Sequence, residues 1–328
     1  MENFSNQSQS QNNSEIPSNN TLENEFTRIM NNKTSTGLKF LNHKRKSKHL
    51  ENKKIVSNRF IDISNGIEKT QILLPIKHKS KLVRSKFDYK SNYINKSYIK
   101  NRQMEEYLLT KEYSCSCVDR CNQSVCDCVI NHAQRYECNS NCGCSDDCEN
   151  RIIQKGINKS LKVDYVSKEK GFGVFARENI KKDEFVCEYV GQIINKNFAI
   201  DKINSNFIRK KPNYVLQIRE NYENMTISTF IDAEEKGNVS RFLNHSCDPN
   251  LYFDIVRVEH FIPQVAFFTL REIKAGEELT FSYCDHSEVN FIDNGLNNTE
   301  NDNTDTNKSK SYKLCECNST NCRKYLPN

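Results

Sequence analysis

Residues 115–148 read CSCVDRCNQSVCDCVINHAQRYECNSNCGCSDDC and contain nine of the chain's fifteen cysteines. Cysteines this close in sequence are typical of metal binding, because zinc takes four ligands in a tetrahedron and thiolate is a preferred one. Nine is odd, which excludes complete disulfide pairing, and it is not a multiple of four. Three zinc ions need twelve ligand positions, which nine thiolates fill if three of them bridge two ions. The stretch therefore predicts a trinuclear zinc cluster, with disulfides or two separate four-cysteine sites as alternatives.

The predicted ligands of this cluster are Cys115, Cys117, Cys121, Cys126, Cys128, Cys138, Cys142, Cys144 and Cys148. A second group lies near the C-terminus and comprises Cys315, Cys317 and Cys322. Three thiolates leave one position open on a tetrahedral ion, which a distant cysteine must fill if the site is structural. Cys187 and Cys284 lie in apolar runs, where a free cysteine packs as a small hydrophobe. Cys247 lies in the polar turn 244–250 (NHSCDPN) and is the predicted fourth ligand.

The composition indicates that part of the chain is unfolded, since hydrophobic residues make up 36% and mean hydropathy is −0.78. Residues 1–57 begin rich in Asn, Ser and Gln, and we expect them to be disordered. Their basic stretch 42–54 (NHKRKSKHLENKK), with further cations over 77–90, favours nuclear import or nucleic-acid contact; a solvated linker is the alternative. Residues 287–312 are rich in Asn and Asp and are predicted to be a flexible linker.

The sequence contains neither a secretory signal pattern nor a run of about 18 apolar residues, so we expect neither secretion nor a membrane span. A reducing compartment then favours metal binding by the cysteines. Residues 161–285 show short alternating runs such as LKVDYV, EFVCEYVG, VAFFTL and ELTFSY, with frequent β-branched and aromatic residues. Such runs predict a domain of short strands.

The motifs together resemble the SET-domain histone-lysine methyltransferases. Residues 115–148 resemble the pre-SET motif, and Cys315-x-Cys317-x4-Cys322 resembles the post-SET motif. Gly171–Val174, Glu188–Gly191, Gly237–Asn250 and Glu278–Tyr283 resemble the SET domain. The order is similar to that of the SUV39-type enzymes and of the methyltransferase part of the SETMAR proteins.

This resemblance implies a mainly β (α+β) fold with a threaded C-terminal segment. The implied domains are a pre-SET zinc domain over 58–152, a SET catalytic domain over 153–286 and a post-SET zinc tail over 313–328. It also implies S-adenosylmethionine as cofactor, four zinc ions (three plus one), a nuclear location on chromatin, and the histone H3 tail or nucleosome as partner. Lysine 9 of histone H3 is the favoured target, with H3 lysine 36 or a non-histone lysine as alternatives. An inactive zinc-binding chromatin scaffold is the alternative from another class.

The resemblance also assigns site residues. Tyr283 corresponds to the catalytic tyrosine, Tyr189 to a second tyrosine of the lysine channel, and Phe281 to the position that sets how many methyl groups are added; phenylalanine there implies di- or trimethylation. Cofactor binding falls on Lys170, Gly171, Phe172, Tyr214, Arg241, Asn244 and His245. The chain departs from the family pattern at Ser282, Gln192 and Phe172, where Asp, Glu and Trp are common.

Overall fold

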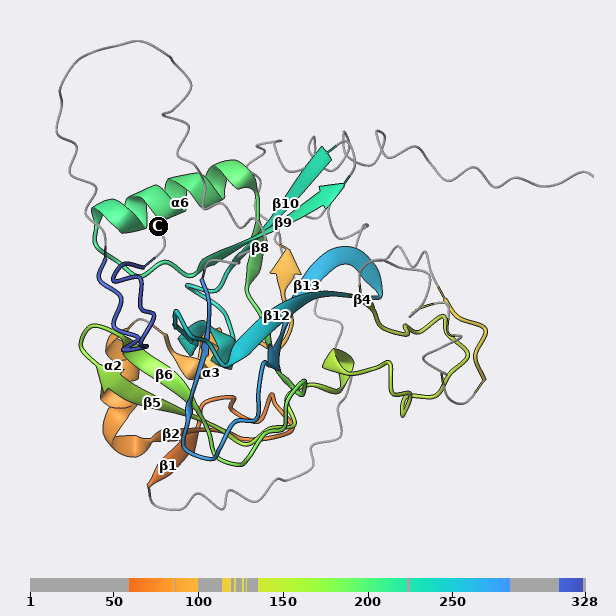
Figure 1. Cartoon of the computed structure of the whole chain (residues 1–328), viewed down its shortest axis with the longest axis horizontal. Coiled ribbons are helices and arrows are strands. Elements are labelled where there is room, and N and C mark those ends of the chain that lie inside the picture. The colour runs from red at the N-terminus through yellow and green to blue at the C-terminus, as the bar shows by residue number, and fades with distance from the viewer. Residues whose placement is uncertain are drawn as a thin grey trace, which may run out of the picture. The chain divides into compact units, whose positions relative to one another are not determined.

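Strands dominate the part of the chain that the computed structural model describes (Figure 1). The described residues are 59–85, 87–99, 114–118, 121, 126, 128, 135–222, 225–283 and 313–326. The prediction of a mainly β fold is confirmed. The predicted disordered region 1–57, its basic stretch 42–54 and the linker 287–312 lie outside the described residues. Within the described ranges, no helix is long and apolar enough to cross a bilayer.

The larger sheet has ten strands in the order β1-β2-β5-β6-β14-β12-β13-β7, with β11 paired to β14 and β4 paired to β12. Its strands are β1 (Phe60–Asp62), β2 (Ile72–Pro75), β4 (Arg135–Tyr136), β5 (Leu161–Ser167), β6 (Gly171–Ala176), β7 (Phe185–Tyr189), β11 (Asn244–His245), β12 (Leu251–Val258), β13 (His260–Thr269) and β14 (Glu278–Phe281). Alternation explains how they pack. In β5, Leu161 and Val163 are fully buried, whereas Lys162 and Asp164 between and after them are partly exposed and form an ion pair.

Strand β14 is the last strand in sequence but lies inside the larger sheet. It runs antiparallel to β6, with Leu279 opposite Val174, and parallel to β11, with Thr280 opposite Asn244. It also pairs in parallel with β12, where Phe281 lies opposite Leu251. The C-terminal part of the domain is therefore held by three earlier strands, and the residues that follow β14 emerge next to β11.

The smaller sheet has the order β3-β8-β10-β9 and carries the longest described helix. Its elements are β3 (Tyr98–Ile99), β8 (Gln192–Ile194), β9 (Val215–Tyr222), β10 (Met225–Asp232) and α6 (Lys196–Ile208). Asn195 caps α6 by accepting a hydrogen bond from the Phe198 amide (2.8 Å). The sequence of this region predicts only strands, and helix α6 was not expected.

Short helical turns join these sheets to the N-terminal part of the described chain. They are η1 (Ile76–His78), α2 (Lys79–Arg84), α3 (Tyr89–Asn92), η3 (Ile153–Lys155) and η4 (Val239–Phe242). Leu82 of α2 and Phe87 are fully buried in the main core, together with residues of β5, β6, β13 and β14. The segment from residue 59 to 99 thus packs as part of the core.

Candidate active site and metal sites

Two tyrosines and two phenylalanines form an aromatic cluster at the end of β14. Phe281 is 5% exposed, and its ring centroid lies 4.9 Å from that of Tyr283 and 4.7 Å from that of Phe267. Tyr189, at the end of β7, lies 6.4 Å from Phe267. The structure therefore brings together the three residues predicted to line the lysine channel, and it adds Phe267, which sequence reasoning missed.

Both tyrosine hydroxyls donate to main-chain carbonyls. Tyr283 Oη donates to Leu243 O (2.9 Å), and Tyr189 Oη donates to Tyr214 O (2.8 Å). Burial raises the pKa of both phenols, so both hydroxyls stay protonated at neutral pH. The cluster therefore holds two fixed, uncharged hydroxyls among apolar rings. Such surroundings disfavour a charged amine and favour a neutral one.

His245 lies between Tyr283 and Cys247, with one ring nitrogen near each. Its Nδ1 accepts a hydrogen bond from the Tyr283 main-chain N–H (3.0 Å), so the ring proton lies on Nε2. Nε2 lies 3.3 Å from Cys247 Sγ. Burial, with a contribution from the Arg323 guanidinium, lowers the pKa of His245 to about 4, so the ring is neutral at pH 7.

The predicted cofactor residues at the start of β6 form a polar network with Glu278 of β14. Lys170 Nζ lies 2.9 Å from Glu278 Oε2, and Asn244 Nδ2 donates to Glu278 Oε1 (2.7 Å) and to Phe172 O (3.1 Å). Gly173 permits this approach, because a Cβ there would lie 2.6 Å from Glu278 Oε1. Gly171 adopts φ +77°, a conformation that favours glycine. Nothing in the sequence around Glu278 indicates this role.

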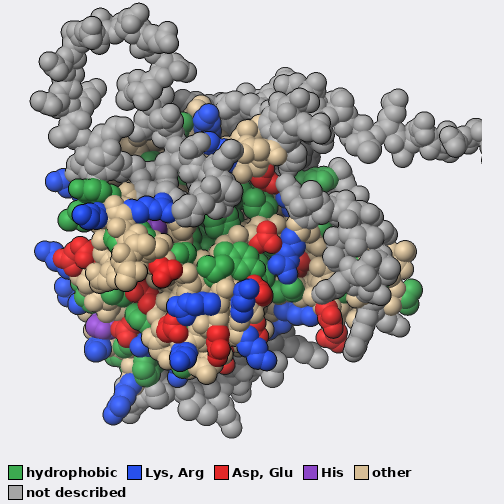
Figure 2. Space-filling view, in the orientation of Figure 1, with side chains coloured by type: hydrophobic (Ala, Val, Ile, Leu, Met, Phe, Trp, Pro, Cys, Tyr) green, Lys and Arg blue, Asp and Glu red, His purple; other side chains and the backbone are tan. Residues whose placement is uncertain are grey.

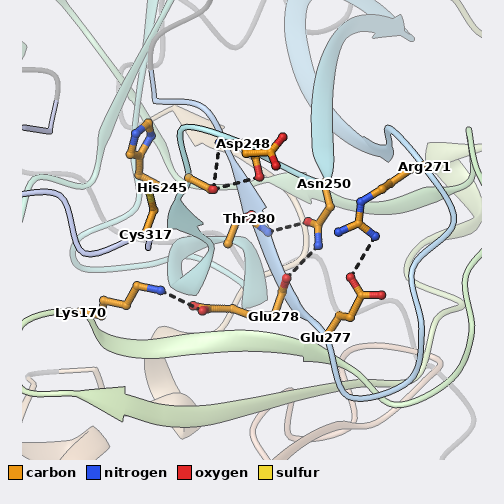
Figure 3. Close-up of a pocket in the computed structure, with 10 residues that line it drawn as sticks. Lys170, His245, Asp248, Asn250, Arg271, Glu277, Glu278, Thr280 and Cys317 are labelled. Carbon is orange, nitrogen blue, oxygen red and sulfur yellow. Dashed lines mark hydrogen bonds and ion pairs between the residues drawn. The ribbon is translucent and has the colours of Figure 1, made fainter. Parts of the chain in front are cut away.

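The Lys170–Glu278 pair borders a hollow of about 230 Å³. Figure 3 draws the residues that line it. His245, Asp248 and Cys317 also line this hollow. Carboxylate, amide and hydroxyl groups dominate its walls, and Asn250 ties them together by donating to Glu278 O (2.8 Å) and accepting from the Thr280 amide (2.9 Å). The arrangement suits a polar ligand with several hydrogen-bonding groups.

Arg241 and Tyr214, two of the predicted cofactor residues, contact each other. The Arg241 guanidinium stacks on the Tyr214 ring (4.3 Å) and on the Phe87 ring (4.2 Å). Its Nε donates to Ala233 O (3.0 Å). Nη1 is buried and has no hydrogen-bond partner among the described residues. A buried free guanidinium donor suits a carboxylate ligand.

The nine cysteines of residues 115–148 gather in one buried group. Their Sγ atoms approach to 3.3 Å (Cys121 to Cys138), 3.6 Å (Cys128 to Cys142) and 4.0 Å (Cys126 to Cys138). A regular tetrahedron with Zn–S bonds of about 2.3 Å has sulfur atoms about 3.8 Å apart, so these spacings fit zinc. Three overlapping sets of four, all containing Cys115, have ligand atoms within 4.8 Å of one another. Overlap of this kind fits thiolates shared between ions.

Neighbouring residues hold this group in place. Asn150 Nδ2 donates to Cys138 Sγ (3.4 Å) and to Tyr136 O (3.0 Å), and Arg151 Nη2 lies 3.7 Å from Cys144 Sγ. These contacts are of the kind that orient metal ligands. Glu137 joins the group to the start of η3 by accepting hydrogen bonds from the main-chain amides of Ile152 (2.9 Å) and Ile153 (2.8 Å).

The second predicted site is also assembled. The Sγ atoms of Cys247, Cys315, Cys317 and Cys322 lie within 4.8 Å of one another, with 3.9 Å between Cys247 and Cys315. The Arg323 amide donates to Cys247 Sγ (3.4 Å) and the Lys324 amide to Cys322 Sγ (3.3 Å). Cys187 is fully buried in β7 instead, and Cys284 lies outside the described residues.

Comparison with known proteins agrees with this geometry. The family model described as the SET domain matches residues 171–284. The probable histone-lysine N-methyltransferase set-23 of Caenorhabditis briggsae is 37% identical over 230 residues, which cover 65% of this chain and 86% of that protein. The histone-lysine N-methyltransferase SETMAR of Rattus norvegicus is 32% identical, covering 65% of this chain and 68% of that protein.

Solved structures give the same result. The methyltransferase domain of human SETMAR superposes with a TM-score of 0.62 at 27% identity, covering 81% of this chain and 97% of that one. SUVH6 of Arabidopsis thaliana, in complex with SAM, superposes with a TM-score of 0.60 at 27% identity and covers 82% of this chain and 56% of that one.

Proposed function

Because this chain belongs to the SET-domain histone-lysine N-methyltransferases, we propose that it transfers methyl groups from S-adenosylmethionine to lysine 9 of histone H3, on chromatin in the nucleus. The observation that carries the proposal is Tyr283. Its protonated hydroxyl donates a hydrogen bond to Leu243 O within the aromatic cluster. Tyr283 follows β14, which lies inside the larger sheet, by two residues. The choice of lysine 9 rests on the resemblance to the SUV39-type enzymes.

The residues around the pocket fit the cofactor. When bound, S-adenosylmethionine supplies a methyl group on a positively charged sulfur. The hollow beside Lys170 and Glu278 offers partners for its ribose and amino groups, and the free Nη1 of Arg241 offers a donor for its carboxylate. Phe172 and Gly171 provide main-chain groups, Asn244 fixes the Phe172 carbonyl, and Tyr214 stacks on Arg241.

The pocket prepares the substrate lysine by making its amine neutral. An exposed lysine has a pKa of about 10.4, so almost all of it is charged at pH 7. The walls formed by Phe267, Phe281, Tyr189 and Tyr283 desolvate the amine and lower that pKa. The Tyr283 hydroxyl then holds the reacting groups in line, which is a proximity effect that needs no nucleophilic side chain.

Phe281 governs the number of methyl groups in this proposal. Its ring contacts both Phe267 and Tyr283 and carries no hydroxyl to restrain the amine. A methylated amine is therefore free to rotate and accept a further methyl group. We infer di- or trimethylation.

The activity is tested with the full chain loaded with zinc, recombinant histone H3 and radiolabelled cofactor, with mass spectrometry to locate the label. We expect label on lysine 9 and a loss of about 100-fold or more in Tyr283→Phe, the order found for removing one transition-state contact. Tyr252→Phe is the matched control, because Tyr252 packs on Phe268 in a different cluster and should keep full activity. Label confined to lysine 36 or to other proteins would reject the choice of lysine 9 but leave the methyltransferase activity standing. No transfer to any substrate would favour the scaffold alternative.

Zinc content tests the metal sites separately from activity. We propose about four ions per chain, three in the residue 115–148 group and one held by Cys247 and the tail. Cys247→Ser is expected to lose one ion by atomic absorption. The control Cys187→Ala should keep all of them, because that thiol is buried in β7 away from both groups. Equal zinc content in the two variants would contradict the assignment of Cys247.

A further inference from the structure

Helix α2 and the preceding turn η1 present a group of cations on the surface. Its members are Lys77 of η1 and Lys79, Lys81 and Arg84 of α2, and the group is here named the α2 surface. All four are exposed, whereas Leu82 between them is fully buried and anchors the helix in the core. No acidic residue occurs from residue 69 to residue 87. Figure 2 shows Lys and Arg side chains along the left edge of the molecule, over α2.

Only part of this charge helps α2 to fold: Lys81 and Arg84 lie in its last turn, where cations suit the helix dipole, whereas Lys79 lies at its N-terminal end. The helix has no acidic residue in its first turn and no side-chain cap. Cations near a helix N-terminus oppose the helix dipole, and like charges three or four residues apart, as in Lys77, Lys81 and Arg84, repel one another. The helix is held by Leu82 and by Lys81, whose Nζ lies 3.5 Å from the Tyr165 ring centroid. Cations that cost local stability point to a role outside the fold.

The α2 surface also lacks carboxylate partners. Some lysines elsewhere on the domain are paired, as in Lys159 with Glu184 (2.8 Å) and Lys170 with Glu278 (2.9 Å). The carboxylate that lies nearby, Asp164, is already shared by His78 (3.3 Å) and Lys162 (2.9 Å). No ion pair within the described ranges involves a cation of the α2 surface. Its field is therefore left for an anionic partner.

We propose that the α2 surface binds the phosphate backbone of duplex DNA and docks the enzyme beside its histone substrate. This rests on the proposed function, because a histone tail leaves a particle wrapped in DNA. Duplex DNA carries one charge per about 1.7 Å of axis, which matches several cations spaced along about 10 Å of η1 and α2. Flexible lysines contact phosphates without reading bases, so the binding is independent of sequence. Docking there raises the effective concentration of the tail at the pocket.

The test compares two triple variants of the full chain. Lys77→Gln with Lys79→Gln and Arg84→Gln removes three cations of the α2 surface. Lys181→Gln with Lys182→Gln and Lys274→Gln removes three exposed cations from distant turns as a matched control. Fluorescence anisotropy with a 30-base-pair duplex is measured over a salt series. We expect the first variant to lose at least about tenfold in affinity at 0.1 M salt, and the slope of log K against log salt to fall by about 2.7, or 0.9 for each lost contact.

The control variant should bind DNA as the parent does. Both variants should methylate a free H3 peptide at the parent rate, and the first should methylate nucleosomes more slowly. Equal losses of DNA affinity in the two variants would reduce the effect to net charge and overturn the proposal. Polyglutamate that displaces DNA as well as unlabelled duplex does would overturn it in favour of an acidic protein partner. A parent chain that binds DNA through α2 but methylates no peptide would instead reject the proposed activity and leave the surface standing.

Discussion

Replacement of His245 should separate two hydrogen bonds that meet on one ring. Nδ1 accepts from the Tyr283 amide, and Nε2 donates toward Cys247 Sγ. Because the pKa of the ring is lowered to about 4, both roles persist at pH 7 without a change of charge. The proposed zinc site of the tail and the proposed catalytic residue Tyr283 are thus joined through one neutral side chain.

Two nearly isosteric variants each keep one of these bonds. In His245→Asn, the amide oxygen replaces Nδ1 as acceptor, and the thiolate loses its donor. In His245→Gln, the longer amide places an N–H near the former Nε2, and the Tyr283 amide loses its acceptor. Loss of an outer-shell contact costs about 10- to 100-fold in metal affinity, or about 1.4 to 2.7 kcal/mol. An unpaired N–H costs about 1 to 3 kcal/mol, and we expect the lower end because Tyr283 is only partly buried.

The assay measures zinc affinity by competition with a coloured chelator, and methyl transfer at saturating zinc. His245→Asn should release one ion about 10- to 100-fold more readily while keeping most of its rate when zinc is in excess. His245→Gln should hold zinc as the parent does and lose rate even in excess zinc. If both variants lost zinc equally, or if excess zinc restored both rates, the two bonds would not act separately and the reasoning would be refuted.

Three further predictions concern stability and product. Glu188 of β7 is half-buried and desolvation raises its pKa to about 8, so the fold is most stable when this carboxyl is protonated. The gain in melting temperature from Glu188→Gln should be small below pH 4.5, grow as the pH rises and level off above 8. Gly191→Ala should lower the unfolding free energy by about 3 kcal/mol in urea titrations, since its Cβ would lie 2.4 Å from Asp232 O. Gly173→Ala should instead weaken cofactor binding in calorimetry, because its Cβ would clash with the movable Glu278 carboxylate. Phe281→Tyr should shift the products toward monomethyl-lysine in mass spectra, and an unchanged distribution would remove Phe281 from its proposed role.

The cysteine groups and the strands were accessible from the sequence because their signals are local. Spacing alone placed nine thiols together, and the polar turn around Cys247 distinguished it from the thiols in apolar runs. Strands such as β5 alternate buried and exposed residues, which the sequence displays directly.

Other features depend on tertiary packing. Helix α6 leaves Phe198, Phe207 and Ile208 exposed, so its sequence has no clean apolar stripe to indicate a helix. Glu278 acquires partners only when β14 lies beside β6 and β11. Phe267 is distant in sequence from the residues it contacts, and no local pattern distinguishes it from the other phenylalanines of β13.

The placement of β14 has a consequence for unfinished chains. A polypeptide that stops before Glu278 contains the complete residue 115–148 cysteine group and most of the sheet, yet β6, β11 and β12 lose their common neighbour. Exposed strand edges pair readily with other chains. Truncated products should therefore still collect metal but aggregate, so that only chains made to the end become soluble catalysts.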